Sequence, residues 1–311
     1  MNNIILTICC LTYNHEKYIR KTLEGFLKQK TKYNFRIIVH DDASTDSTQL
    51  IINEFTQKYP EKFITIFQKE NQYSKGIRIY DNFISPIINT KYIALCEGDD
   101  YWCDENKLEL QLEYMENNPE CSLCIHNTLM ISENGESLNK TFNYIGVSKK
   151  ISIEELIMKS ICQTSSYLYR SEYRNVPADL RVPGIGDYPL RLWLALHGAV
   201  FYIDRVMSCY RVGVVNSWSL INKTNVDQQV NHNINMINFY NNVNKYTNYK
   251  YRRAIQIKIA TYEYNNIQIT KRYWKIFFNK FYLILFIKQF LPQSIKNILK
   301  NFYITKKCNE L

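Results

Sequence analysis

Residues 91–103 read KYIALCEGDDYWC, and this stretch decides the fold. An apolar run over residues 91–95 ends in three acids grouped around one glycine: Glu97, Asp99 and Asp100. Acids at the end of a buried strand repel one another and lose hydration, which is costly unless a cation lies among them. A divalent cation with a phosphate on its far side would neutralise the cluster. The stretch therefore predicts an enzyme that acts on a nucleotide or another phosphorylated donor.

Apolar strand patterns alternate with amphipathic helix patterns on both sides of this stretch. The expected strands are residues 4–11, 35–39, 63–67, 91–96, 122–126, 164–169, 200–203 and 206–210. The expected helices are residues 16–29, 47–59, 77–88, 151–160, 190–196, a helix capped by Asp104, and most of the chain from 226 onward. This alternation predicts an α/β fold with a doubly wound, mostly parallel sheet and a helical C-terminal extension.

Three polar clusters directly follow expected strands: residues 12–14, residues 41–42 and residues 97–100. Ligands of doubly wound sheets bind outside the carboxyl ends of the strands. We therefore expect the three clusters to converge on one site. Neither GxGxxG nor GxxxxGK[ST] occurs after the first strand, which argues against a dehydrogenase and against a P-loop enzyme.

With their neighbours, these clusters resemble glycosyltransferase family 2, whose members have the GT-A fold. The matching stretches are TYNHEKYI at 12–19, HDDASTD at 40–46 and YIALCEGDDYW at 92–102. Their order and spacing fit the family over roughly residues 3–120. The resemblance implies a nucleotide-sugar-binding half at 1–103, an acceptor half at 104–220, and a separate helical region at 221–311.

The resemblance also implies roles in donor binding. Thr12, Tyr13 and Asn14 would border the nucleotide, and Glu16 would follow at the start of the helix. Asp41 or Asp42 would recognise the base, usually uracil; helix capping is the alternative role of the polar run that follows them.

Residues Glu97, Gly98 and Asp99 occupy the position of the family's DxD motif, with Glu97 in place of the first aspartate. Asp99 is then the best metal ligand, with Asp100 beside it, and the implied cofactor is Mn²⁺ or Mg²⁺.

On the acceptor side, Asp187 directly precedes an apolar helix, where the family places its general base. A helix N-cap is the competing role, and Asp179 and Asp204 are weaker candidates for the base. Arg211 would neutralise the diphosphate or pair with a structural acid. Gly213 stands where relatives carry a histidine.

Trp102 and Trp218 are the candidates for stacking on a sugar ring of the acceptor, and core burial is the alternative for each.

The function expected from this resemblance is inverting transfer of a sugar from a nucleoside-diphosphate sugar to a hydroxyl group during surface polysaccharide synthesis. The family's tendency favours UDP over GDP and dTDP as the nucleotide. The expected acceptor is an oligosaccharide or a lipid-linked sugar. Two alternatives remain open: a nucleotidyltransferase, and a non-catalytic subunit that binds nucleotide sugars or assists assembly at the membrane.

Composition adds expectations about location and partners. The nine cysteines are scattered through apolar runs, which favours reduced core thiols and a reducing compartment. Cys121 and Cys124 form one CxxC without a second pair, so a zinc site is not expected. No basic segment precedes the apolar stretch at the N-terminus, so we expect no signal peptide.

Positive charge is concentrated at the C-terminal end of the chain. Residues 271–311 hold nine of the 39 Lys and Arg residues but one acid. Beside the apolar run of residues 281–287, this charge predicts peripheral contact with the inner face of the cell membrane. Packing on the catalytic body or on a second copy in a homodimer is the alternative. A nucleic-acid partner is not expected, because the main domain is nearly neutral.

Overall fold

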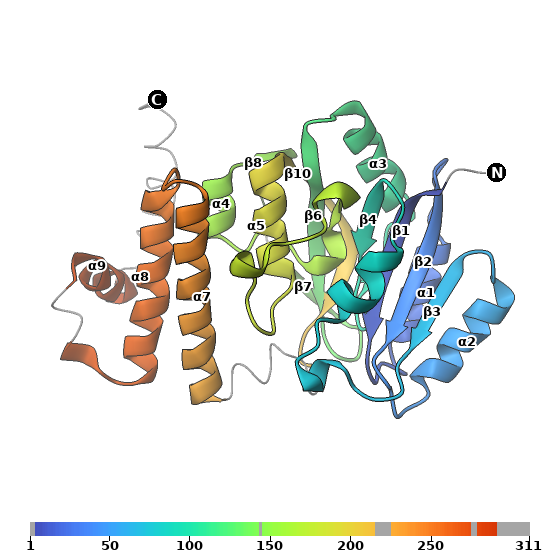
Figure 1. Cartoon of the computed structure of the whole chain (residues 1–311), viewed down its shortest axis with the longest axis horizontal. Coiled ribbons are helices and arrows are strands. Elements are labelled where there is room, and N and C mark those ends of the chain that lie inside the picture. The colour runs from blue at the N-terminus through green and yellow to red at the C-terminus, as the bar shows by residue number, and fades with distance from the viewer. Residues whose placement is uncertain (1–3, 143–144, 215–224, 275–278, 291–311) are drawn as a thin grey trace. The chain divides into compact units, whose positions relative to one another are not determined.

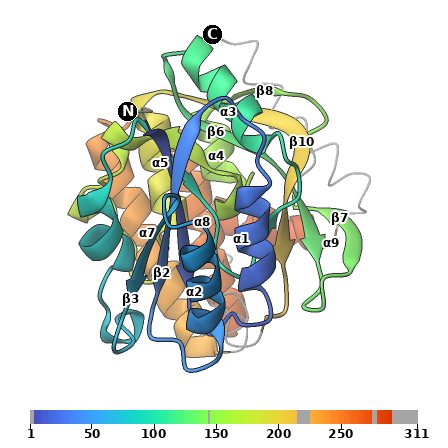
Figure 2. The same ribbon diagram turned by 90° about the vertical axis from the view of Figure 1, so that its right-hand side faces the viewer.

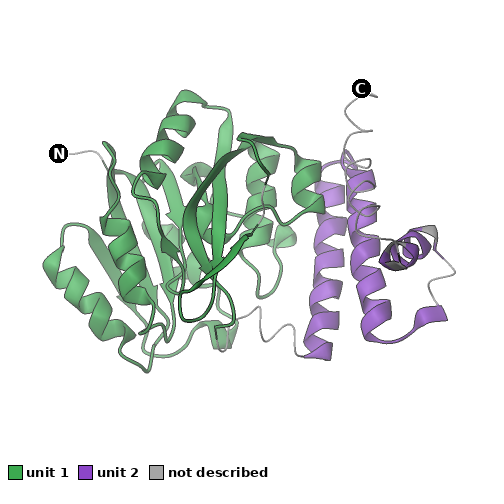
Figure 3. Cartoon of the chain, turned by 180° about the vertical axis from the view of Figure 1, so that it is seen from behind, with its two compact units in different colours: residues 1–220 green, residues 221–311 purple. Residues whose placement is uncertain are grey.

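The computed structural model describes residues 4–142, 145–214, 225–274 and 279–290. The chain divides into two compact units, Met1–Leu220 and Ile221–Leu311 (Figure 3). The first unit is built on one large sheet, and the second consists of helices.

The first half of the sheet is parallel. β1 (Ile4–Thr12) pairs with β2 (Asn34–Asp41) on one side and with β4 (Tyr92–Leu95) on the other, and β3 (Phe63–Phe67) extends the sheet beyond β2. These strands are short apolar runs, as expected for strands that are covered on both faces. Because they run in one direction, the segments that follow β1, β2 and β4 emerge at the same edge (Figure 1).

The second half of the sheet is mixed. β9 (Leu168–Arg170) lies antiparallel between β4 and β6 (Cys121–Ile131), and β10 (Ala199–Arg211) runs parallel to β6. The sheet order is β3-β2-β1-β4-β9-β6-β10-β5. The remaining strands are β5 (Tyr101–Trp102), which pairs with β10, β7 (Ser137–Thr141), which pairs with β6, and β8 (Lys149–Ile151), which pairs with β10. The predicted α/β class with a GT-A-like sheet is confirmed.

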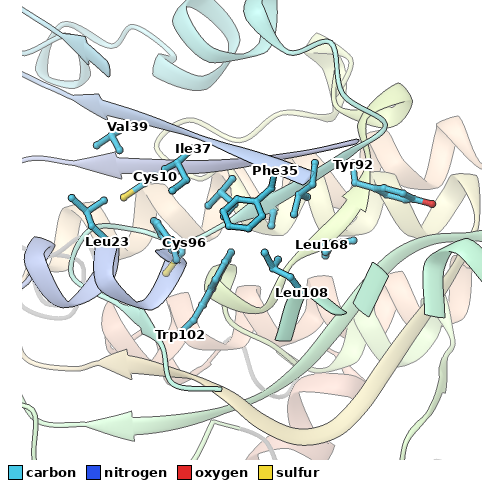
Figure 4. Packing of buried hydrophobic residues seen from close by; sticks show 14 of the residues in the cluster. Cys10, Leu23, Phe35, Ile37, Val39, Tyr92, Cys96, Trp102, Leu108 and Leu168 are labelled. Atoms are coloured by element: carbon cyan, nitrogen blue, oxygen red, sulfur yellow. The ribbon is translucent and has the colours of Figure 1, made fainter. Parts of the chain in front are cut away.

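α1 (Ile19–Leu27) and α2 (Thr48–Lys58) cover one face of the parallel half (Figure 2), and α3 (Lys107–Asn117) packs on β6 and shares the same core. Their apolar side chains meet alternate residues of β1 and β2 in the main core, which Figure 4 shows from close by. Labelled members of this core are Cys10, Leu23, Ile37, Val39, Trp102 and Leu108. The contact is close enough that a Cβ atom at Gly25 of α1 would lie 2.8 Å from the carbonyl oxygen of Trp102.

Residues 73–88 pack against a different set of side chains and form short turns. These are η1 (Tyr73–Lys75), the π-helical turn η2 (Tyr80–Ile84) and the 3₁₀ turn η3 (Ser85–Ile87). The helix expected over 77–88 is therefore present over residues 80–87, but as a π-helical turn followed by a 3₁₀ turn and not as a regular α-helix. Pro86 lacks the N–H that a regular helix needs at this point, and the chain tightens there. Aromatic contacts hold the segment on the sheet: the rings of His40 and Phe83 lie 5.4 Å apart.

Three further local predictions need correction. The segment 164–169 begins as the 3₁₀ turn η4 (Thr164–Ser166) and becomes strand only in β9. The two strands expected at 200–210 are one strand, β10, with register shifts between Ile203 and Ser208. Asp104 is not the N-cap of α3; that position is Asn106, whose backbone N–H donates to Asp104 Oδ1 at 2.9 Å.

Other short elements complete the first unit: α4 (Ile153–Met158), η5 (Ser171–Tyr173), η6 (Ala178–Leu180) and α5 (Asp187–His197). α4 begins with a reciprocal capping box between Ser152 and Glu155.

In the second unit, α7 (Val226–Tyr246) packs against α8 (Arg252–Ile269), and α9 (Lys280–Phe290) packs against α8. None of the helices in the described residues combines the length and apolar character that a bilayer crossing requires.

Candidate active site

The acidic loop, residues 97–100, follows β4 and is held in place by its backbone. The N–H of Gly98 donates to the carbonyl oxygen of Leu11 at 2.9 Å. Thr22 Oγ1, on α1, lies 3.0 Å from the carbonyl oxygen of Gly98 and 2.6 Å from that of Asp100. A Cβ atom at Gly98 would lie 2.8 Å from atoms of both Thr12 and His15. Glycine is therefore required here by space, because the loop runs directly against the segment that follows β1.

The loop brings three carboxyl groups together. One oxygen from each of Glu97, Asp99 and Asp100 lies within 4.8 Å of the others. Loss of hydration and then the charge of Asp99 raise the pKa of Asp100 well above its usual range. Glu97 keeps solvent access, but protein atoms crowd its carboxyl group; this desolvation, with the charges of Asp99 and Asp187, raises the pKa of Glu97 to about 8.

This donor set fits a hard divalent cation. All three ligands are carboxylate oxygens, which Mg²⁺ and Mn²⁺ accept and which softer metals do not select. The raised pKa values report mutual repulsion and desolvation, which a cation would relieve. Within the described residues, these three acids are the group of His, Cys, Asp and Glu side chains that could hold a metal.

Arg211, at the end of β10, fixes the acidic loop from the other side. Its backbone N–H donates to Asp100 Oδ1 at 2.9 Å, and its Nε donates to the carbonyl oxygen of Asp99 at 3.0 Å. Its Nη1 reaches the carbonyl oxygens of Ser132 and Glu133 at 3.2 and 2.6 Å. Arg211 is 6% exposed, and its guanidinium donates to backbone carbonyl oxygens. These contacts give Arg211 a structural role, and a role toward the diphosphate stays a prediction.

The segments that follow β1 and β2 are joined by reciprocal hydrogen bonds. The Asn14 N–H donates to Ser44 Oγ at 2.8 Å, while Asn14 Oδ1 accepts from the N–H of Thr45 at 2.8 Å. Asn14 adopts a left-handed conformation with φ of 55°, which asparagine tolerates better than most residues. Both segments are thus positioned by each other.

Further hydrogen bonds join the two segments near the starts of α1 and α2. The Glu16 N–H donates to Asp46 Oδ2 at 3.1 Å, and Glu16 Oε2 accepts from the N–H of Ser47 at 3.0 Å. The N–H of His15 donates to Thr48 Oγ1 at 2.8 Å. Glu16 therefore serves the backbone of α2 in this structure.

Asp41 and Asp42 both make hydrogen bonds inside the protein. Asp41 accepts from the N–H and the hydroxyl of Ser44 and from Gln49 Nε2. The Asp42 carboxylate accepts from the backbone N–H groups of Gln72 and Tyr73 at 2.8 and 3.0 Å. Asp42 thus secures the segment that follows β3. Recognition of a base by either residue stays a prediction.

Asp187 is the first residue of α5, and Gly186 occupies the N-cap position. The side chain is half-buried, and its charge contributes to the raised pKa of Glu97, which places it within electrostatic reach of the acidic loop. The carbonyl oxygen of Asp187 accepts from the Tyr167 hydroxyl at 3.4 Å. The arrangement is compatible with a proton acceptor beside the acidic loop.

Of the two tryptophans predicted to stack on a sugar, the structure describes one. Trp102 is 3% exposed, donates from Nε1 to the carbonyl oxygen of Ser165 at 2.9 Å, and packs edge to face on Phe26 with ring centroids 4.7 Å apart. This burial favours the core role for Trp102 over contact with a sugar. Trp218 lies outside the described residues. Tyr13, by contrast, is 43% exposed and lies at the start of the segment that follows β1.

Three further residues of this region were not among the predicted site residues. Thr22 holds the acidic loop, and nothing in its helical stripe indicated that role. His15 packs against Gly98, and its Nδ1 has no hydrogen-bond partner among the described residues. Arg191, one helical turn after Asp187, is 1% exposed and lies over the ring of Tyr188 at 4.6 Å. A buried arginine in an apolar helix is a signal that the sequence did offer.

The family model for glycosyl transferase family 2 matches residues 7–173, which include both joined segments, the acidic loop and β9. The chain belongs to glycosyltransferase family 2. The resemblance found in the sequence is thereby confirmed.

Relatives of this family-2 chain include an uncharacterized protein of Mycobacterium tuberculosis, 33% identical over 217 residues. That match covers 68% of this chain and 60% of the mycobacterial protein, so the chain spans about three-fifths of that relative's length. A second relative is the Escherichia coli protein named UDP-Glc:alpha-D-GlcNAc-diphosphoundecaprenol beta-1,3-glucosyltransferase WfaP. It is 36% identical over 112 residues, or 36% of this chain and 41% of WfaP.

Solved structures agree on the fold. Staphylococcus aureus TarS in complex with UDP-GlcNAc superposes with a TM-score of 0.55 at 14% identity, covering 85% of this chain and 81% of that chain. Mannosyltransferase PcManGT from Pyrobaculum calidifontis, solved with GDP-Man and Mn²⁺, gives a TM-score of 0.53 at 12% identity, covering 77% and 64%.

Proposed function

We propose that this protein is an inverting glycosyltransferase that moves a sugar from a nucleoside-diphosphate sugar, preferably a UDP-sugar, to a hydroxyl acceptor. The observation that carries the proposal is the cluster of Glu97, Asp99 and Asp100 at the end of β4 in a family-2 chain. The names of WfaP and of the TarS complex contain UDP-sugars, which supports a UDP-sugar as the donor. The PcManGT complex contains GDP-Man, so a GDP-sugar is included in the donor-binding experiment.

The proposed chemistry divides the work between two groups of acids. Glu97, Asp99 and Asp100 would hold a divalent cation, and the cation would offset negative charge on the departing diphosphate. Asp187 accepts the proton of the acceptor hydroxyl while that oxygen attacks the anomeric carbon from the face opposite the diphosphate. One C–O bond forms, the bond to the diphosphate breaks, and the anomeric configuration inverts. Thr22 and Arg211 keep the acidic loop in place during this step.

Donor binding is tested by thermal shift with UDP-Glc, UDP-GlcNAc, GDP-Man and a dTDP-sugar, each with and without Mn²⁺. We expect one UDP-sugar to stabilise the protein only when the metal is present. Asp99→Asn should weaken this binding by about tenfold or more, because a charged ligand is lost. Glu113→Gln, an exposed acid on α3, is the matched control and should bind as the native protein does. Equal donor binding with and without metal would contradict the metal site.

Transfer itself is tested with Asp187→Asn. The amide cannot accept a proton but keeps nearly the same shape, so we expect turnover to fall by about 100-fold or more. The dissociation constant for the donor should stay unchanged, since Asp187 is proposed to act on the acceptor hydroxyl. Full turnover in this variant would remove Asp187 from its role. Donor binding without turnover by the native protein, across lipid-linked and oligosaccharide acceptors, would indicate a non-catalytic binding subunit.

We further propose that the C-terminal region contacts the inner face of an anionic membrane, where a lipid-linked acceptor resides. Tyr282, Leu285 and Phe286 of α9 pack on α8, while Leu283, Ile284 and Ile287 are 39, 38 and 50% exposed. The sequence from 271 onward is strongly basic. An apolar helix face within a basic segment is suited to anionic lipid, and the acceptor in the name of WfaP is attached to a lipid diphosphate.

A further inference from the structure

Cys103 directly follows β5, and Cys209 lies on β10, the antiparallel neighbour of β5. β5 pairs with β10 so that Tyr101 is opposite Cys209 and Trp102 is opposite Ser208. The pairing extends one residue further, because the N–H of Cys103 donates to the carbonyl oxygen of Met207 at 3.1 Å. Side chains two residues apart on a strand lie on the same face. Cys103 is therefore the diagonal cross-strand neighbour of Cys209, a position from which side chains interact.

The two thiols differ from the other cysteines of the described chain. Cys103 is exposed and Cys209 is buried, and the two side chains hydrogen bond to each other. The hydrogen bond from Cys103, with the Tyr101 hydroxyl and the charges of Lys21 and Arg211, lowers the pKa of Cys209 to about 7 despite its burial. Cys103 keeps the shared proton, and its pKa is raised.

Six further cysteines in the described chain are buried, and burial is the first cause that raises the pKa of each. They are Cys9, Cys10, Cys96, Cys121, Cys124 and Cys162. Reactive cysteines are found in partly exposed, electropositive surroundings, and buried structural cysteines are inert. In the described chain, the pair divides these two features, because Cys209 has the lowered pKa and Cys103 has the exposed side chain.

We propose that Cys103 and Cys209 form a dithiol site that a small peroxide converts into an intramolecular disulfide and that low-molecular-weight thiols reopen. The proposal does not depend on the sugar-transfer activity. The site lies next to the acidic loop in sequence: Cys103 follows Asp100 by three residues, and Cys209 precedes Arg211 by two. The closed disulfide would covalently join the two strands that carry the acidic loop and Arg211.

Formation of the disulfide takes two steps and consumes one molecule of peroxide. The thiolate of the pair attacks one peroxide oxygen; the O–O bond breaks, and hydroxide leaves and takes up a proton as water. The sulfenic acid that results is attacked by the second sulfur. An S–S bond forms, the S–O bond breaks, and the second thiol proton leaves with the hydroxide as water. Two thiols are oxidised by two electrons in total, and one peroxide molecule is reduced to two molecules of water.

The test treats the full-length reduced protein with an equimolar amount of hydrogen peroxide and compares intact mass and non-reducing peptide maps. We expect loss of two hydrogens, a linked peptide pair containing Cys103 and Cys209, and full reversal by dithiothreitol. Cys103→Ser and Cys209→Ser should each abolish the link. Cys121→Ser should retain it, because Cys121 is a buried thiol away from β5.

Two results would overturn the proposal. One is a disulfide between other cysteines while Cys103 and Cys209 remain alkylatable. The other is direct oxidation of Cys103 to the sulfinic or sulfonic acid without a link to Cys209. Cys103 is exposed, so Cys103→Ser is expected to fold. This variant therefore decides the test even if Cys209→Ser fails to fold. Repeating the experiment in a Cys308→Ser background excludes links through the C-terminal cysteine.

Discussion

At the scale of single residues, the site depends on a glycine more than on any charged group. Gly98 lets the acidic loop run against Thr12 and His15, because a methyl group there would lie 2.8 Å from both side chains. The carboxylates can meet only if this contact is kept. The position of the acids is therefore a consequence of backbone packing between the segments that follow β1 and β4.

Gly98→Ala is expected to displace the acidic loop. Forcing a methyl group into a packed contact costs about 1–3 kcal/mol of stability, measurable by urea denaturation, and metal-dependent donor binding should be lost with it. Gly186→Ala is the matched control, since a Cβ atom there meets nothing within 4 Å. Its cost should stay below about 1 kcal/mol, which is the loss expected when alanine replaces glycine at a helix N-cap without a steric clash. Equal costs for the two variants would contradict this account.

Sequence patterns identified the acids but not how they are held. The run at 97–100 stood out because acids rarely follow a buried strand, and the structure brings those carboxylates within 4.8 Å. The same reasoning assigned Asp42 to a ligand, while in the structure it binds the backbone at Gln72 and Tyr73. A long-range partner of this kind has no local signature. Thr22, whose hydroxyl contacts the acidic loop, likewise had no sequence signal, whereas Arg211 was predicted to pair with an acid or a diphosphate and does contact the loop.

At the scale of elements, α3 carries a lysine inside the core. Lys107 is fully buried; its Nζ donates to Gln111 Oε1 at 2.7 Å and lies 3.9 Å from the centre of the Trp102 ring. Gln111 in turn donates to the carbonyl oxygens of Cys124 and Ser166 at 2.8 and 2.9 Å. This polar chain ties α3 to β6 and η4. Burial is the first cause that lowers the pKa of Lys107, to about 7.

The buried lysine gives folding a pH dependence with a definite sign. Between pH 7 and about 10 the unfolded chain holds the Lys107 proton while the folded chain has released it, so stability rises with pH. The rise is at most about 1.4 kcal/mol per pH unit, and below pH 7 both states are protonated and the contribution is flat. Lys107→Met should remove this rise in urea denaturation at pH 7, 8 and 9.

The comparison is made against Lys28→Met, whose native side chain is 73% exposed. That variant should keep the native slope, because an exposed lysine has similar surroundings in both states. Identical slopes for Lys107→Met and the native protein would mean that the buried ammonium is solvated in the fold. The difference between variants matters here, since buried cysteines and tyrosines with raised pKa values act in the opposite direction at high pH.

Elements were predictable where burial alone shaped the pattern. The strands β1 to β4 and the helices α1 to α3 follow the apolar periodicity closely. Residues 77–88 and 164–169 did not, because proline and buried polar side chains override periodicity there. Two strands were expected where β10 is a single strand. The interruption in the apolar pattern corresponds to register shifts, which a strand can contain without ending.

At the scale of the whole molecule, the chain combines an almost neutral first part with a basic end. The membrane proposal is tested by flotation with liposomes of phosphatidylglycerol or phosphatidylcholine. Ile284→Glu with Ile287→Glu should reduce binding to the anionic liposomes by about tenfold or more, since two exposed apolar contacts are lost and charge repulsion is added.

Leu50→Glu, on α2, is the control for that experiment, because Leu50 is 68% exposed and lies in the first unit. Equal flotation of the double variant and the control would end the membrane proposal. A shift of the double variant from dimer to monomer in light scattering, with flotation unchanged, would instead indicate that α9 contacts a second copy.

The mutual hydrogen bonds between residues 12–16 and 41–48 have a consequence for engineering. Each segment completes the backbone geometry of the other through Asn14, Glu16 and Asp46, so neither is an independent module. Suppose that one segment is grafted from a relative that prefers another nucleotide sugar. Hydrogen-bond donors and acceptors between the two segments would then be left without partners. A chimera that exchanges both segments together should fold, whereas either single exchange should not, and recombination between relatives is expected to keep the two as one inherited block.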